Sequence, residues 1–366
     1  MRGAGPAVVA VLASVVVAAS APAIGQARAA LQSAFPGQYR LILGSIVALA
    51  AAAAIGGAVL RIRTQRARRY GLLGAAVAIA VAFNVASLTG NADVDAVERF
   101  HFVEYGAVAW LYFRVWREHD DVSLVVLPLC GGLLTSLADE WVQWFVPGRV
   151  GELRDVFLNG VALACGLLVG LAFDGRLPVW RAPAPRTRRA LAAGLGAVLL
   201  GVAAFVQLVH LGHAIDDGSS RFISTFSRDE LLRASYDRRA RWAIDPPTML
   251  RRFSREDRYL EEALWHVQRR NGANAANDFD SAWRENVVLE TYFGPVLEFP
   301  SYAGRTRWPD EQRQTVRQQV IDEHAPFLSR AHPIPIWTIA PWALWTMTLA
   351  AIAVVTGICL GAGRRI

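Results

Sequence analysis

The chain has 366 residues, of which 54% are hydrophobic, and its mean hydropathy is +0.28. This composition excludes an ordinary soluble domain and places the chain among helical membrane proteins. The formal net charge is +7, but all 38 basic residues are arginine and Ala is abundant, which is typical of a GC-rich coding sequence. The positive charge therefore gives no reason to expect a nucleic-acid partner.

Apolar runs of about 20 residues, the length that crosses a hydrocarbon core of ~30 Å, predict the membrane-spanning helices. Eight such segments can be identified, at about 6–24, 41–60, 70–89, 101–116, 122–143, 155–173, 190–211 and 336–361. The 124 residues from 212 to 335 are polar and charged. We therefore predict an all-α, polytopic transmembrane bundle of about eight helices with a small helical extracytoplasmic domain.

The same pattern predicts how the chain is divided. The parts are two N-terminal transmembrane helices (1–69), a transmembrane core (70–173), a cytoplasmic loop with the seventh transmembrane helix (174–211), the extracytoplasmic domain (212–335) and a C-terminal transmembrane helix (336–366).

The distribution of arginine predicts the orientation. With a cytoplasmic N-terminus, the short inner segments carry fifteen arginines and the short outer loops carry five. The positive-inside rule then places both termini in the cytoplasm and residues 212–335 outside, in the cytoplasmic membrane of a bacterium. The arginine run from Arg61 to Arg69 is interpreted as a topology determinant that touches anionic lipid.

The first segment allows two interpretations. Arg2, a short apolar core and the small residues Ala19-Ser20-Ala21 resemble a signal peptide. Pro22, just after that candidate cleavage site, favours an uncleaved helix instead.

Ionisable and polar side chains gather at the ends of three neighbouring apolar segments, although a charged residue at a helix centre costs about 2.5–3.5 kcal/mol on insertion scales. Residues three or four positions apart share a helix face, so each segment presents one polar stripe. A polar stripe in lipid must face the bundle interior or a cavity, and the three stripes are predicted to meet around one site. The residues are His101, Glu104 and Tyr105, then Asp139, Glu140 and Gln143, then Arg149, Asp155 and Asn159.

The order HFVEY, DEWVQWFVPGR and DVFLNGVALACG resembles the VanZ-like family over about residues 70–173. The family pattern is a His and a Tyr on one helix, an acidic residue with Gln and Pro-Gly-Arg at the end of the next, and Asp-Val-x-x-Asn with a later Gly on the third. The matching positions are His101, Tyr105, Glu140, Gln143, Pro147, Gly148, Arg149, Asp155, Val156, Asn159 and Gly166. Asp139 departs from the pattern by adding a second acid beside Glu140.

The family is named for a protein associated with resistance to the glycopeptide teicoplanin, and its members have no generally established reaction. The resemblance implies a fold region and a site, and it identifies neither a substrate nor a cofactor.

Two interpretations of the polar site remain open. In the first, crowded carboxylates create a proton donor beside a proton acceptor, with Glu140, Asp155 and His101 as candidate catalytic groups. Arg149 would hold a phosphate or carboxylate, and Gln143, Asn159, Tyr105, Glu104 and Asp139 would contact the ligand. In the second, the same side chains only hold helices together. A metal held by His101 and carboxylates is a weaker alternative, without HExxH or DxD spacing to support it.

Residues 212–335 contain near-equal numbers of acidic and basic residues and no cysteine, so a disulfide framework is excluded there. Helices are predicted from Ser227 to about Ala240, from Ser254 to about Arg270, over Phe279–Tyr292 and from Trp308 to about His324, with a loop at 271–277. Glu261, Glu262 and His266 are interpreted as part of an amphipathic surface.

These features support two functions, and they leave open whether the protein is an enzyme. The first is a cell-envelope protein that binds or modifies a lipid-linked precursor or glycopeptide-like molecule. The second is a non-enzymatic scaffold whose exported domain binds an envelope protein. Membrane lipids are expected partners in both cases. A transporter is disfavoured because the sequence shows no inverted repeat.

Overall fold

The computed structural model describes residues 4–35, 37–88, 90–146, 149–177, 182–218, 220–242, 255–299, 304–322 and 327–361. The chain divides into two compact units. The first comprises Met1–Gln143, Gly151–Phe205 and Trp345–Ile366, and the second comprises Trp144–Val150 and Val206–Leu344. We describe each unit by itself.

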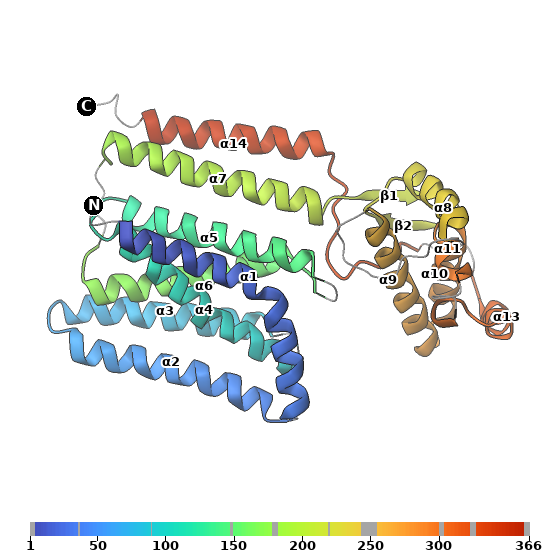
Figure 1. The fold of residues 1–366 in the computed structure, drawn as a ribbon, viewed down its shortest axis with the longest axis horizontal. Helices are drawn as coiled ribbons and strands as arrows, with labels where there is room; N and C mark the ends of the chain where they lie inside the picture. Colours follow the sequence, from blue (N-terminus) through green and yellow to red (C-terminus); the bar gives the residue numbers. More distant parts are fainter. Residues whose placement is uncertain are drawn as a thin grey trace. The chain divides into compact units, whose positions relative to one another are not determined.

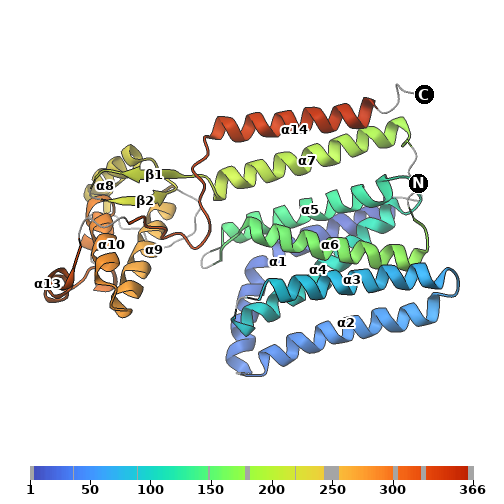
Figure 2. The same ribbon diagram turned by 180° about the vertical axis from the view of Figure 1, so that it is seen from behind.

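The first unit is built from long helices (Figures 1 and 2). They are α1 (Ala4–Ala34), α2 (Tyr39–Arg61), α3 (Arg66–Ala86), α4 (Ala92–Trp116), α5 (Ser123–Trp144), α6 (Leu153–Asp174), α7 (Pro185–Val209) and α14 (Pro341–Gly361). Figure 1 shows a bend in α1, and Pro22 lies inside this helix, where it removes a backbone donor. The predicted segments are confirmed as helices.

Seven helices of the described residues, all of these except α4, are long and apolar enough to cross a membrane. Large apolar side chains such as Val16, Leu49 and Leu60 are 65–71% exposed on their surfaces, which is the pattern of a lipid-facing bundle. The chain is therefore a multi-pass membrane protein of the all-α class.

The central helix α4 differs from the others in charge. It begins nine residues before the predicted segment and carries Asp95 and Glu98 in its added turns, both buried. It packs against α1, α2, α3 and α6. Packing against neighbouring helices therefore surrounds these acidic side chains with protein.

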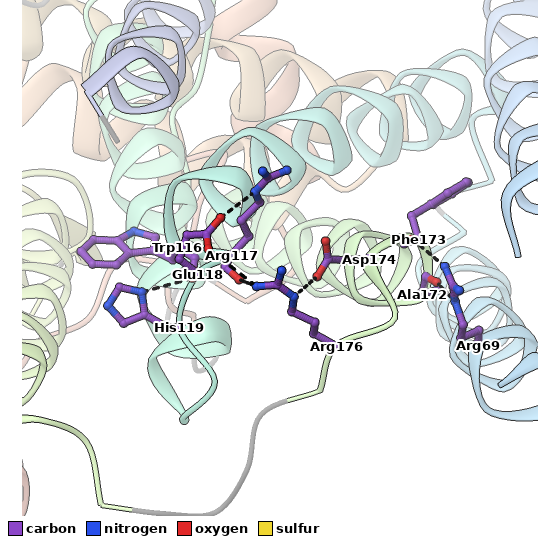
Figure 3. Close-up of polar contacts among 9 residues, drawn as sticks. All are labelled: Arg69, Trp116, Arg117, Glu118, His119, Ala172, Phe173, Asp174 and Arg176. Carbon is purple, nitrogen blue, oxygen red and sulfur yellow. Dashed lines mark hydrogen bonds and ion pairs between the residues drawn. The ribbon is translucent and has the colours of Figure 1, made fainter. Parts of the chain in front are cut away.

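Arginine side chains make polar contacts with residues at the ends of neighbouring helices in the first unit (Figure 3). Arg69 at the start of α3 donates from Nε to the Ala172 carbonyl and from Nη2 to the Phe173 carbonyl, both at 2.6 Å. These carbonyls belong to the last turn of α6, where a cation also compensates the helix dipole. Arg69 is only 8% exposed. Its interpretation as part of a lipid-touching run is therefore wrong, because it caps a neighbouring helix.

Figure 3 also shows Arg176 beside Asp174 and Glu118. The Arg176 guanidinium lies 3.3 Å from the Asp174 carboxylate and 3.9 Å from the Glu118 carboxylate. The Glu118 side chain is 73% exposed, so ion pairs of this kind contribute little to stability.

The second unit combines a hairpin with short helices. The strands β1 (His213–Asp216) and β2 (Arg221–Ser224) pair antiparallel, with His213 opposite Ser224. The helices are α8 (Arg228–Trp242), α9 (Arg255–Ala275), α10 (Phe279–Tyr292), α11 (Gly294–Glu298) and α13 (Asp310–Gln319). Phe222, Tyr259, Tyr292 and Phe293 are fully buried in the core that these elements share.

Several predicted details of this unit are confirmed. Ser227 and Glu230 form a reciprocal capping box: the Ser227 amide donates to Glu230 Oε2 at 2.9 Å and the Glu230 amide donates to Ser227 Oγ at 3.4 Å. The helix over Phe279–Tyr292 has the predicted bounds. Ser254, the predicted cap of the next helix, lies outside the described residues.

Other details are corrections. The hairpin was not predicted, although Asp217-Gly218 is a hairpin-turn signal and Gly218 has a positive φ of 84°. Residues 271–275 were predicted as a loop and instead complete α9, while α13 ends at Gln319. Glu262 and His266 are 0% exposed and Glu261 is 9% exposed, so the assignment of these three residues to a surface is wrong.

Glu262 predicts a pH dependence of stability. Burial by itself raises the pKa of this carboxyl, but His332, at 3.2 Å, and the Ser224 hydroxyl outweigh burial and hold the pKa below its usual 4.5. A lowered native pKa stabilises the fold above the usual pKa, and this stabilisation is lost as the pH falls. We expect the full chain in detergent to lose thermal stability below pH 4.5.

As the pH falls, the melting temperature of the Glu262→Gln variant should decrease less than that of the natural protein. Glu298→Gln, at a half-exposed site, serves as the control. An identical pH slope in the natural protein and in Glu262→Gln would contradict the assignment.

Candidate functional site

The centre of the site joins α4 to α5 through buried side chains. The Tyr105 hydroxyl donates to Asp139 Oδ2 at 2.8 Å. Tyr105 is 0% and Asp139 is 5% exposed. Asp139, the residue that departs from the family pattern, thus accepts the hydrogen bond from the Tyr105 hydroxyl.

Gln143 connects the two adjacent acids. Its Nε2 donates to Asp139 Oδ2 at 3.0 Å and to Glu140 Oε1 at 3.2 Å, because positions 139, 140 and 143 share one face of α5. The other oxygen of Glu140 accepts the backbone amide of Glu152 at 3.1 Å, just before α6 begins. Glu140 therefore holds the start of α6 against the end of α5.

Asn159 of α6 reaches α5 at a deeper level. Its Nδ2 donates to Ser136 Oγ at 2.9 Å, and both residues are 0% exposed. The amide oxygen of Asn159 has no hydrogen-bond partner within the described part of the chain. Ser136 was not predicted as a member of the site, although its place one turn before Glu140 was a usable signal.

His101 and Glu104 form an accessible rim beside the buried centre. Their side chains are 18% and 19% exposed, and His101 Nδ1 lies 3.8 Å from Glu104 Oε2. The His101 ring stacks on Tyr105, with centroids 5.9 Å apart. These two side chains are thus more exposed than Tyr105 and Asp139 of the buried centre.

The remaining predicted residues of the site are Asp155 and Arg149. Asp155 lies 3.6 Å from Arg154, which also donates to the buried Glu98 at 2.6 Å. The Glu98–Arg154 pair was missed because its residues lie 56 positions apart. Arg149 belongs to the second unit, so its assignment as an anion clamp stays a prediction. Pro147 and Gly148 lie outside the described residues.

Chemically, the centre holds two adjacent carboxylates beside neutral donors. A tyrosine hydroxyl and an amide satisfy carboxylate oxygens without supplying a positive charge. Such a pair can hold a proton, orient a hydroxyl or amine of a ligand, or fix the packing of three helices. Among the described residues, no group of three or more His, Cys, Asp or Glu side chains could hold a metal ion.

A second feature of the first unit is an apolar groove of about 710 Å³ between α2, α3, α4 and α6. Its walls include Ala54 of α2, Val77 of α3, Gly106 of α4 and Val169 of α6. Phe102 and Val103 also line the groove, and they are next to the rim residues His101 and Glu104. Residues of the groove and of the polar rim therefore both belong to α4.

Comparison with known proteins agrees with the sequence pattern. Residues 41–174 match the family model described as VanZ/LLP1. The match begins at α2 and thus extends further toward the N-terminus than the predicted 70–173. No curated protein and no solved structure matches the chain. We call the matched stretch, which runs from α2 to the end of α6, the VanZ-like region.

Proposed function

We propose that the VanZ-like region binds a lipid-linked molecule of the bacterial cell envelope. The observation that carries this proposal is the apolar groove, whose lining residues all lie between Val47 and Phe173, inside the matched region. A groove of this composition suits a hydrocarbon chain, and the His101–Glu104 rim on the same helix α4 suits the polar group that the chain carries.

In this proposal, Glu104 and His101 contact the ligand head group. Glu140 and Asp155 serve as anchoring or acid–base groups, and Arg149 contacts a phosphate or carboxylate of the ligand. Both termini lie in the cytoplasm, and the site and residues 212–335 face the outside of the cytoplasmic membrane. The alternative ligand for the same site is a glycopeptide such as teicoplanin. The proposed link to antibiotic resistance rests on the family name.

A second candidate is a non-enzymatic scaffold whose exported domain binds an envelope protein. The burial of Tyr105, Asp139, Glu140 and Asn159, each at most 5% exposed, favours it, because closed interhelical hydrogen bonds are what a packing role requires.

The groove provides the test. Ala54 lines it, and we expect Ala54→Phe to fill part of its volume. A fluorescent polyprenyl-diphosphate-linked sugar, titrated into the full chain in detergent and followed by fluorescence polarisation, should bind the natural protein. Binding should weaken at least tenfold in Ala54→Phe, which corresponds to about 1.4 kcal/mol. Glu140→Gln should insert normally and also bind more weakly.

Ala52→Phe is the matched control, because Ala52 is on the same helix, is exposed and does not line the groove. Equal affinity of the two phenylalanine variants for the lipid-linked probe would contradict the proposal. Loss of folding in Glu140→Gln, with no ligand bound by the natural protein, would favour the scaffold.

A further inference from the structure

The second unit contains a pocket of about 520 Å³ that plays no part in the site described above. It is lined by the end of α7, the hairpin, the first turns of α8 and α9, and the segment before α14. Gln207, His213, Glu230, Arg255, Arg258 and Pro341 are among its lining residues. None of the lining residues belongs to the VanZ-like region.

The pocket has an excess of positive charge. Arg255 pairs with Glu230 at 2.6 Å and lies over the Phe226 ring, 5.2 Å from its centroid. Arg258, one turn along the same face of α9, is half-buried and makes no hydrogen bond or ion pair with any described residue. Glu230 is the only acidic residue among the pocket's described lining residues, so the two guanidinium groups leave a net positive charge there.

The electrostatics of Arg258 agree with this arrangement. Its partial burial, and then the like charge of Arg255, lower the pKa of its guanidinium, while Glu230 acts in the opposite direction. An anion beside Arg258 would compensate both effects, because a charge is stabilised by an opposite charge within about 4–6 Å.

The pocket lies at the ends of two apolar helices. Gln207 is in the last turn of α7 and Pro341 is the first residue of α14, and both helices are long and apolar enough to cross a membrane. Trp337 stacks on His210 with centroids 5.0 Å apart, and Trp342 is 73% exposed. Tryptophan is enriched at the level of lipid head groups, so these residues indicate the depth of the pocket.

We propose that this pocket binds the phosphate group of an anionic phospholipid, whose acyl chains stay in the bilayer. Arginine suits this ligand because its planar guanidinium donates two parallel hydrogen bonds to a phosphate. The head group supplies the negative charge that Arg258 lacks, at the depth where lipid phosphates lie. The second unit is in this way anchored to the leaflet at which α7 ends and α14 begins.

Native mass spectrometry of the full chain tests the proposal. The protein, in a neutral detergent, is titrated with phosphatidylglycerol or with phosphatidylcholine, and bound lipids are counted. We expect one tight phosphatidylglycerol site that phosphatidylcholine fills at least tenfold less well. Arg258→Gln should weaken this site at least tenfold.

Arg233→Gln is the matched control, because it removes the same charge from an exposed position of α8 outside the pocket. Equal phosphatidylglycerol binding by Arg258→Gln and the natural protein would overturn the proposal. Displacement of the lipid by millimolar inorganic phosphate would overturn the lipid assignment and indicate a free-anion site. Hydrogen exchange of α8 and α9 verifies that both variants are folded. The readout is independent of the Ala54 groove, so the two proposals can fail separately.

Discussion

Replacing Gly166 with alanine is expected to separate α4 from α6 and to cause the largest loss of stability of any single methyl addition in the VanZ-like region. A Cβ at Gly166 would lie 2.5 Å from the Gly106 Cα and 2.6 Å from its carbonyl oxygen. These are backbone atoms, which cannot rotate away as a side chain can. Overpacking costs about 1–3 kcal/mol or more, and we expect the upper end here.

The effect is measured by heating the full chain in detergent and recording the temperature at which the monodisperse protein is lost. The control is Gly106→Ala on the facing helix, where the added Cβ would lie 3.9 Å from the Gly166 Cα, at ordinary contact distance. We expect Gly106→Ala to be tolerated and Gly166→Ala not. Similar melting temperatures for the two variants would show that the helices do not approach as described.

Replacing Glu285 with alanine is expected to destabilise the second unit's core. This carboxylate is 0% exposed and accepts from Ser329 Oγ at 2.5 Å, while His266 Nδ1 lies at 2.7 Å and Arg269 Nε at 2.9 Å. Removing one partner of a buried charged pair costs about 3–5 kcal/mol, because the others lose their acceptor. The melting temperature of this unit should fall on the order of 10 °C.

Hydrogen exchange of peptides from α9 and α10 localises the effect to this unit. The control is Glu298→Ala, which removes a carboxylate that pairs with Arg239 at 2.8 and 2.9 Å but is 51% exposed. An exposed pair contributes about 0–1 kcal/mol, so this variant should remain near the natural stability. Unchanged exchange in Glu285→Ala would mean that the buried network does not hold the core.

The polar site shows what spacing along one helix can predict. Gln143 contacts both Asp139 and Glu140, as positions three and four apart must when they share a face. Which helix each face meets depends on rotation and packing, which spacing does not encode. Tyr105 therefore donates to Asp139, 34 residues away in the sequence. Asn159 donates to Ser136, 23 residues away.

By itself, the sequence determined the approximate positions of the apolar helices, the VanZ-like motif and the capping box at Ser227, because each depends on residues within a few turns. Only the tertiary structure decided that Arg69 caps α6, that Glu262 and His266 are buried, and that Arg255 and Arg258 line a pocket with the ends of α7 and α14. These outcomes depend on contacts between segments far apart in the chain, where packing overrides local charge and periodicity.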